Sequence, residues 1–115
     1  MEMNIVKEHI KRIELAEIAS AEFGYMVKEV VDVRQGIMAI GGELHADEEV
    51  LLTEQCGSKR EDTWGIDLYP KKEGEDWIEF DSMVNIKPAH GNRSRNVEDQ
   101  GIRKKIVAVV GKLVS

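Results

Sequence analysis

The sequence predicts an α+β fold in which an antiparallel sheet of about five strands is preceded by one helix and followed by another. Apolar residues recur with helical spacing near both ends of the chain and alternate with polar residues in several segments between them. The breaks between these segments are short, which favours antiparallel neighbours, because a parallel pair needs a crossover of a dozen or more residues. We therefore expect a two-layer meander with both helices packed on one face of the sheet.

The two predicted helices are defined by apolar stripes at three- and four-residue spacing. The first covers residues 11–23, and Gly24 gives it a natural C-terminal end. The second covers residues 99–113, with Asn96 or Asp99 as its N-cap. The apolar side chains are Ile13, Leu15, Ala16, Ile18, Ala19 and Phe23 in the first helix, and Ile102, Ile106, Val109, Val110 and Leu113 in the second.

The segments between the helices are typical of strands, because they are rich in β-branched residues or alternate between apolar and polar positions. The five predicted strands span residues 27–33, 37–45, 50–54, 63–69 and 76–87, and residues 3–7, before the first helix, could add a short edge strand. In the last two, one face carries Trp64, Ile66, Leu68, Ile78, Phe80, Val84 and Ile86. Burial of one face fixes the register of a strand, so we expect these side chains to be buried beneath the helices.

Size and composition favour a single globular domain over residues 1–115. The one cysteine, Cys56, can form no disulfide within the chain. No apolar run approaches the ~20 residues that cross a bilayer, and the N-terminal residues lack the apolar centre of a signal peptide. We therefore expect a cytoplasmic protein that contacts no membrane.

The formal net charge of −6 is divided unevenly along the chain. Residues 41–81 hold thirteen acidic and four basic side chains, whereas residues 82–115 hold seven basic and two acidic ones. These segments either neutralise each other within the fold or form a surface of two signs, which would attract an anionic ligand or a second copy of the chain. The acidic balance of the whole chain argues against nucleic acid as a partner.

The loop before the predicted C-terminal helix contains Arg93, Arg95, His90 and Asn92, a combination typical of an anion site. The N-terminus of a helix offers unpaired N–H donors and a partial positive charge. Arginine adds a planar fork of donors that matches phosphate and carboxylate groups. We expect these four residues to bind a small anion or a phosphorylated metabolite.

Two alternatives stay open for this loop. The arginines could pair with carboxylates of the same fold, for instance Glu79 or Asp81, and so fasten the loop. The loop could instead contact another protein. Tyr69 and Trp77 on the outer face of the sheet, together with an exposed sheet edge, favour a homodimer.

A second polar cluster consists of Glu43, His45 and Asp47, which share one face if the strand continues through them. On a straight strand Glu43 and Asp47 are about 13 Å apart, too far to share a metal whose ligand bonds are about 2 Å long. We therefore expect no bound metal, and the cluster can be a solvated outer face. A bend at Ala46 would instead make it the centre of a metal-dependent hydrolase or transferase.

The sequence contains none of the common catalytic signatures CxxC, HExxH, GxSxG, GxxxxGK or GxGxxG. No residue pair is therefore identified as a nucleophile with its base. We expect a small binding or interaction domain that uses no cofactor, in preference to an enzyme.

The strings GGELHAD, WGIDLYP, IEFDSMVNIKP and GNRSRNVED resemble a family of small prokaryotic proteins of unknown function. The resemblance covers the chain from about Phe23 to its end. It implies a prokaryotic, cytosolic protein, and it brings no activity, substrate or cofactor with it.

Overall fold

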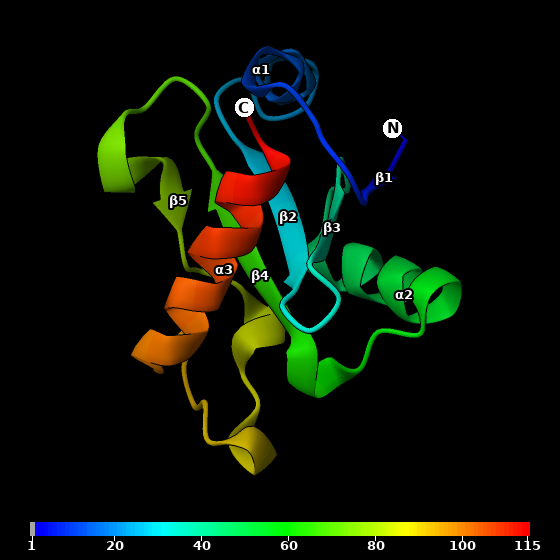
Figure 1. The fold of residues 1–115 in the computed structure, drawn as a ribbon, viewed down its shortest axis with the longest axis vertical. Coiled ribbons are helices and arrows are strands. Elements are labelled where there is room, and N and C mark those ends of the chain that lie inside the picture. Colours follow the sequence, from blue (N-terminus) through cyan, green and yellow to red (C-terminus); the bar gives the residue numbers. More distant parts are fainter. Residues whose placement is uncertain (1) are drawn as a thin grey trace.

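The computed structural model describes residues 2–115 and contains a five-stranded antiparallel sheet with three α-helices packed on it (Figure 1). The strands are β1 (Asn4–Val6), β2 (Val27–Asp32), β3 (Ile37–Ile40), β4 (Thr63–Leu68) and β5 (Ile78–Glu79), in the order β1-β3-β2-β4-β5. The helices are α1 (Arg12–Ala21), α2 (His45–Cys56) and α3 (Gln100–Leu113). Met1, which the predicted domain includes, lies outside the described residues.

The α+β class is confirmed, but the arrangement differs from a simple meander in two ways. β2 pairs with both β3 and β4, although α2 lies between β3 and β4 in the chain. The helices also cover both faces of the sheet. α1 and α3 pack on the main core, whereas Leu52 of α2 packs with Val30 and Ala39 in a smaller core on the opposite face.

Helices α1 and α3 lie where the sequence predicts them. Gly24 follows α1 with a φ of 87°, and its N–H donates to the carbonyl of Ala19 at 2.6 Å. Asp99 is the N-cap of α3, and its side chain accepts a hydrogen bond from the N–H of Ile102 at 3.0 Å. Within residues 2–115 no helix has the length and the apolar character needed to span a membrane.

Helix α2 occupies residues for which the sequence predicted the end of one strand and the whole of another, so that prediction was wrong. The buried face of α2 consists of His45, Glu48 and Leu52. Because two of these three side chains are polar, the helical period of apolar residues is missing. Gly57 ends the helix in the left-handed region with a φ of 65°, and its N–H donates to the carbonyl of Thr53.

The long strand predicted over residues 76–87 is also largely wrong, because only Ile78–Glu79 belongs to the sheet. The residues that follow form short 3₁₀ turns and fold back onto β4. The side chain of Asn85 is buried there and bonds both backbone groups of Gly65, at 2.8 Å to the nitrogen and 2.9 Å to the oxygen. The side chain of Asn85 thus makes the hydrogen bonds to Gly65 that the backbone of a neighbouring strand would otherwise make. The alternation of apolar residues in the sequence does not reveal this.

The predicted apolar face of these strands is only partly buried. Trp64, Ile66, Leu68 and Val84 are buried, whereas Ile78, Phe80 and Ile86 are half-buried. Phe80 stays at the edge of the core beneath the guanidinium of Arg103, whose carbon lies 4.5 Å from the ring centroid. One face of the Phe80 ring is therefore covered by a guanidinium group rather than by an apolar side chain.

The face of the sheet that carries α2 is apolar beneath the helix and polar beyond its N-terminus. The strand register places Asp67 of β4 opposite Lys28 of β2 on one side and opposite Glu79 of β5 on the other. Side chains at paired positions point to the same face. These three polar residues therefore lie together near the start of α2, on the opposite face of the sheet from α3.

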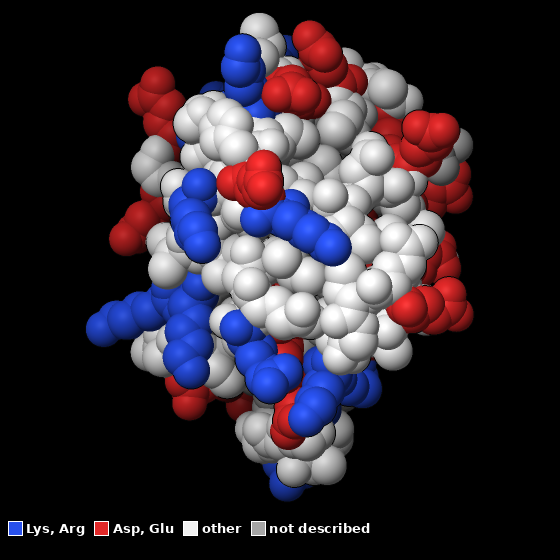
Figure 2. All heavy atoms as spheres, turned by 45° about the vertical axis from the view of Figure 1, so that its right-hand side comes forward, with Lys and Arg blue, Asp and Glu red and all other residues white. Residues whose placement is uncertain are grey.

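Charged side chains cover the surface unevenly (Figure 2). On the face drawn there, Lys and Arg side chains gather on the left and towards the bottom, whereas many Asp and Glu side chains lie along the right-hand edge. Among the described residues, arginines form ion pairs only between Arg60 and Glu49 and between Arg95 and Asp81. Only the second pair joins the basic C-terminal segment to the acidic central one, so most of this charge is solvated.

Candidate functional site

The first residue of α2, His45, lies against the middle of β4. Its Nε2 atom is 2.8 Å from the carbonyl oxygen of Ile66 and 3.1 Å from Oδ1 of Asp67. A carbonyl only accepts hydrogen bonds, so Nε2 carries a proton and donates it to Ile66. The imidazole is buried, with 8% of its residue surface exposed, and its orientation is fixed by these contacts.

Three carboxylates converge beside His45. Asp67 and Glu79 face each other across β4 and β5, and Asp81 follows two residues later. One oxygen of each lies within 4.8 Å of the others. Asp67 is buried, Asp81 is half-buried and Glu79 is exposed, so the cluster runs from the interior to the surface. Carboxylate oxygens in this arrangement can hold a hard divalent cation.

Each carboxylate has a different neighbour. The hydroxyl of Tyr69 donates to Glu79 at 2.9 Å, and Nε of Arg95 donates to Asp81 at 2.6 Å. Burial, together with the hydrogen bond to Glu79, raises the pKa of Tyr69, and the bond to Asp81 raises the pKa of Arg95. Oδ1 of Asp67 receives no hydrogen bond from any described residue.

A cavity of about 290 Å³ adjoins the cluster. Its walls are formed by Lys28, Leu44, His45, Ala46, Asp81, Ser82, Met83, Val84 and Arg95. The cavity thus collects side chains from β2, from the beginning of α2 and from the loop that follows β5. Leu44 is the N-cap of α2, and no side chain caps the helix there.

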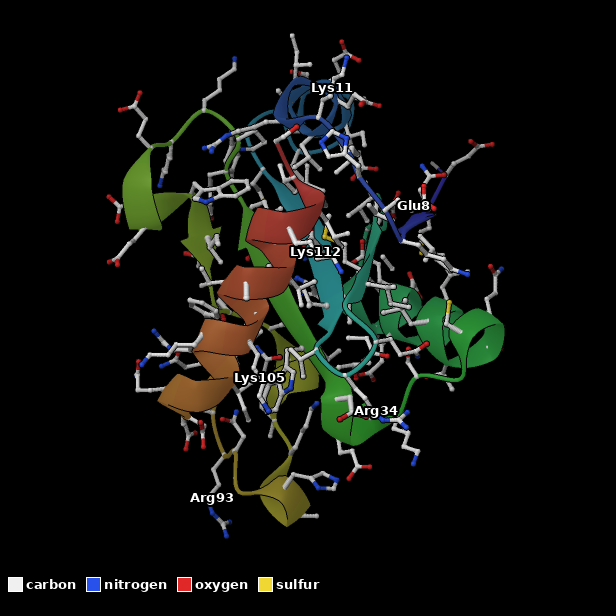
Figure 3. All side chains as sticks on the ribbon, in the orientation of Figure 1. Glu8, Lys11, Arg34, Arg93, Lys105 and Lys112 are labelled. Atoms are coloured by element: carbon white, nitrogen blue, oxygen red, sulfur yellow. The ribbon has the colours of Figure 1, made fainter. Side chains whose placement is uncertain are left out.

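Of the four residues predicted to bind an anion, only Arg95 lines this cavity. Arg93 is exposed and points away from the body of the molecule (Figure 3). His90 is exposed on a 3₁₀ turn. Asn92 is buried, and its side-chain nitrogen donates to the carbonyls of Asn85 and Asn96, both at 2.7 Å. Asn92 therefore stabilises the conformation of the loop and is not available to bind a ligand.

The three residues considered for a metal centre are not brought together. His45 lines the cavity beside Asp67, whereas Glu43 and Asp47 line a separate hollow with Met3, Gly41 and Gly42. The strand that would have aligned them ends at Ile40, and α2 begins at His45. Residues two apart on a helix do not share a face, so Asp47 points away from His45.

The sequence reasoning missed Lys28, Asp67 and Tyr69 as site residues. It did name Glu79 and Asp81, but only as partners of the arginines. The missing step was the pairing of β4 with β5, which puts Glu79 directly opposite Asp67. A strand carrying an acidic residue on its outer face next to a second such strand is the signal that could have led to the cluster.

Several further buried charged groups lie outside this site. Lys87 is buried, its Nζ donates to the carbonyls of Arg60 and Thr63, and it lies 3.9 Å from the centre of the Trp64 ring. Burial lowers the pKa of Lys87 to about 8. Its donors are directed at the backbone, so Lys87 fastens the loop after β5 to the beginning of β4. Glu29, Asp32 and Glu48 are buried as well.

Comparison with known proteins gives one match. A family model described as "Protein of unknown function (DUF5674)" matches residues 4–113. No curated protein and no solved structure matches the chain. The match covers nearly the whole chain, including every residue of the site described above.

Proposed function

The chain belongs to the DUF5674 family of unknown function, and we propose from the geometry of its site that it is a small binding domain for an anionic ligand. The ligand's phosphate or carboxylate group is held in the cavity at the start of α2. The observation that carries this proposal is the meeting of an uncapped helix N-terminus with Lys28 and Arg95 in one cavity.

The start of α2 supplies backbone donors. The first N–H groups of any helix have no acceptor within the helix, and they are usually capped by a side chain. In α2 the carbonyl of Leu44 accepts from Asp47 and Glu48, and no side chain caps the N-terminus. The amides of His45 and Ala46 are thus left for a ligand, where the helix dipole also favours negative charge.

Arg95 supplies a charged fork at the other wall of the cavity. Its Nε is bonded to Asp81, which orients the guanidinium, whereas the terminal nitrogens Nη1 and Nη2 make no hydrogen bond with any of residues 2–115. These two nitrogens can bind a phosphate or carboxylate group in a bidentate manner. Lys28 adds a second positive charge from β2.

This proposal keeps the anionic ligand that the sequence predicts and moves its site from the start of α3 to the start of α2. The N-terminus of α3 is already capped by Asp99. The loop ahead of it is closed by Glu98, whose carboxylate accepts from the N–H of Arg93 at 3.0 Å and from the hydroxyl of Ser94 at 2.7 Å. The backbone and hydroxyl donors of that loop are therefore already occupied by Glu98.

The test is a calorimetric titration of inorganic phosphate into the protein at low ionic strength. Removal of a hydrogen bond to a charged group costs about 1.5–3 kcal/mol, so Arg95→Ala should weaken phosphate binding by about 10–100-fold. Arg93→Ala is the matched control, because it removes the same charge two residues away. It should change the dissociation constant by less than about twofold.

Circular dichroism of each variant checks that the fold is intact. Lys28→Ala tests the contribution of β2 to the same cavity and should weaken phosphate binding as well. Equal losses in Arg93→Ala and Arg95→Ala would mean that only the general charge of the loop matters. That result, or the absence of saturable phosphate binding to the unmodified chain, would contradict the proposed site.

A further inference from the structure

We propose that Asp67, Glu79 and Asp81 form a binding site for one hard divalent cation of the Ca²⁺, Mg²⁺ or Mn²⁺ type. The site adjoins the anion cavity but does not rest on the proposed function, because the cation can be added and measured alone. It is built from three elements of the fold: β4, β5 and the segment that follows β5.

The spacing of the carboxylates matches a single ion. One oxygen of each residue lies within 4.8 Å of the other two. Two oxygens that bind the same Ca²⁺ at about 2.4 Å can be at most about 4.8 Å apart. A small movement of the side chains therefore brings the three oxygens onto one ion, and the exposed side at Glu79 leaves room for water molecules to complete the coordination.

Asp67 gives a second observation that points to a ligand. The residue is only 5% exposed, and its Oδ1 receives no hydrogen bond from any described residue. The proton on Nε2 of His45 is donated to Ile66, at 2.8 Å, rather than to this oxygen. A buried carboxylate oxygen without a donor is costly, and a cation bound at the cluster removes that cost.

The charges around the cluster leave the three carboxylates under-compensated. Arg95 pairs with Asp81. Nε2 of His45, 3.1 Å from Oδ1 of Asp67, is the nearest donor to that carboxylate. Lys28 stands opposite Asp67 in the strand register, but its Nζ lies over the ring of Phe23, 5.5 Å from the centroid, and forms no ion pair with the cluster. Three neighbouring carboxylates repel one another electrostatically. A bound divalent cation neutralises their charge and so removes this repulsion.

The donor set selects the class of metal. All three donors are carboxylate oxygens, and the Nε2 atom of the nearby His45 is engaged with the backbone. Zinc prefers imidazole and thiolate ligands, whereas Ca²⁺, Mg²⁺ and Mn²⁺ prefer oxygen. The site is therefore expected to bind these hard cations in preference to Zn²⁺.

The experiment measures thermal unfolding and isothermal calorimetry of the full chain with CaCl₂, MgCl₂ or MnCl₂ as the probe, in a buffer without phosphate. We expect one ion per chain and a rise in the melting temperature of about 4–8 °C when the cation is at ten times its dissociation constant. Glu79→Gln and Asp67→Asn should each weaken cation binding by about tenfold or more.

Glu54→Gln is the control, because Glu54 is an exposed carboxylate near the opposite end of α2 from His45. It should leave the affinity within about twofold of the unmodified chain. Asp67→Asn should also unfold no more easily than the unmodified chain when no cation is present, because it relieves repulsion in the cluster. If Asp67→Asn does not fold, Glu79→Gln decides, since Glu79 is exposed.

Two results would overturn the inference. One is the absence of saturable binding for all three cations at millimolar concentration. The other is binding that Glu79→Gln and Glu54→Gln weaken equally, which would assign it to diffuse negative charge. Because phosphate is absent, neither result bears on the anion cavity, and failure of the phosphate titration leaves the cation result standing.

Discussion

Glu29 shows at the scale of one residue how this fold depends on protonation. The residue is fully buried, faces Ile40 and Ile66 on the neighbouring strands, and neither of its carboxyl oxygens has a hydrogen-bond partner among residues 2–115. Burial raises the pKa of this carboxyl well above 4.5. Burial also raises the pKa of Glu48 on α2, although one oxygen there accepts from the N–H of Gly42 at 2.9 Å. Both groups are therefore favoured in the neutral form in the folded chain.

The raised pKa of Glu29 predicts a stability that falls as the pH rises. Well below the ordinary carboxyl pKa of 4.5 the group is protonated in both states, and its full contribution to stability is present. Above that value the unfolded chain loses a proton that the folded chain keeps, so stability is lost progressively as the pH rises towards the raised pKa. The urea concentration at the midpoint of unfolding should therefore decrease as the pH is raised from about 5 towards the raised pKa.

Glu29→Met should reduce this fall, since it replaces the carboxyl by an apolar group of similar length. Glu17→Gln, at an exposed position on α1, should keep the pH slope of the unmodified chain. The measurement is the urea midpoint of the three proteins at each pH. Identical slopes for the unmodified chain and Glu29→Met would show that this carboxyl does not carry the pH dependence.

The residues of the site were visible in the sequence one by one, but their grouping was not. The pairing of Arg95 with Asp81 was one of the alternatives considered, and it is found at 2.6 Å. His45 was singled out with Glu43 and Asp47, because an extended strand was assumed there. Its neighbour Asp67 is twenty or so residues further along, and only the packing of α2 on β4 brings the two together.

At the scale of elements, apolar faces with a regular period led to correct predictions. α1, α3 and β4 bury aliphatic residues at the period of their own structure, so the pattern identifies them. α2 buries His45 and Glu48, and the segment after β5 is held by Asn85 through hydrogen bonds to Gly65. Polar side chains that replace apolar contacts leave no periodic signal, and both of these elements surround the candidate site.

Two glycines test how closely this segment packs on β4. A Cβ on Gly65 would lie 2.5 Å from the Cβ and Oγ atoms of Ser82, whereas a Cβ on Gly111 in α3 would meet no atom within 4 Å. Gly65→Ala should therefore destabilise the fold by about 1–3 kcal/mol through overpacking. Gly111→Ala should stabilise it by about 0.5–1 kcal/mol, because alanine is the better helix former.

Chemical denaturation of both variants checks this pair of predictions. The two substitutions add the same methyl group, so their difference isolates the close approach at Gly65. A Gly65→Ala variant as stable as the unmodified chain would mean that the segment carrying Ser82 and Arg95 can move away from β4 without cost.

At the scale of the whole molecule, the order of the strands determines which side chains meet at the candidate site. β4 lies between β2 and β5, so side chains from all three strands reach the same face, and α2 begins directly above them. A simple meander would have put the segment between residues 45 and 56 at the level of the sheet and left this face without a helix N-terminus. The departure from the expected topology therefore creates both the cavity and its uncapped amides.

The central claim is that the start of α2, together with Arg95, forms a site for an anionic group. The most direct test is a ¹H–¹⁵N NMR titration of the labelled full chain with inorganic phosphate, which reports every backbone amide separately. The account predicts saturable shifts concentrated at His45, Ala46 and the residues flanking Arg95, with little change at His90 and Arg93. Shifts confined to the 90–94 loop, or no saturable shift at His45 and Ala46, would contradict it.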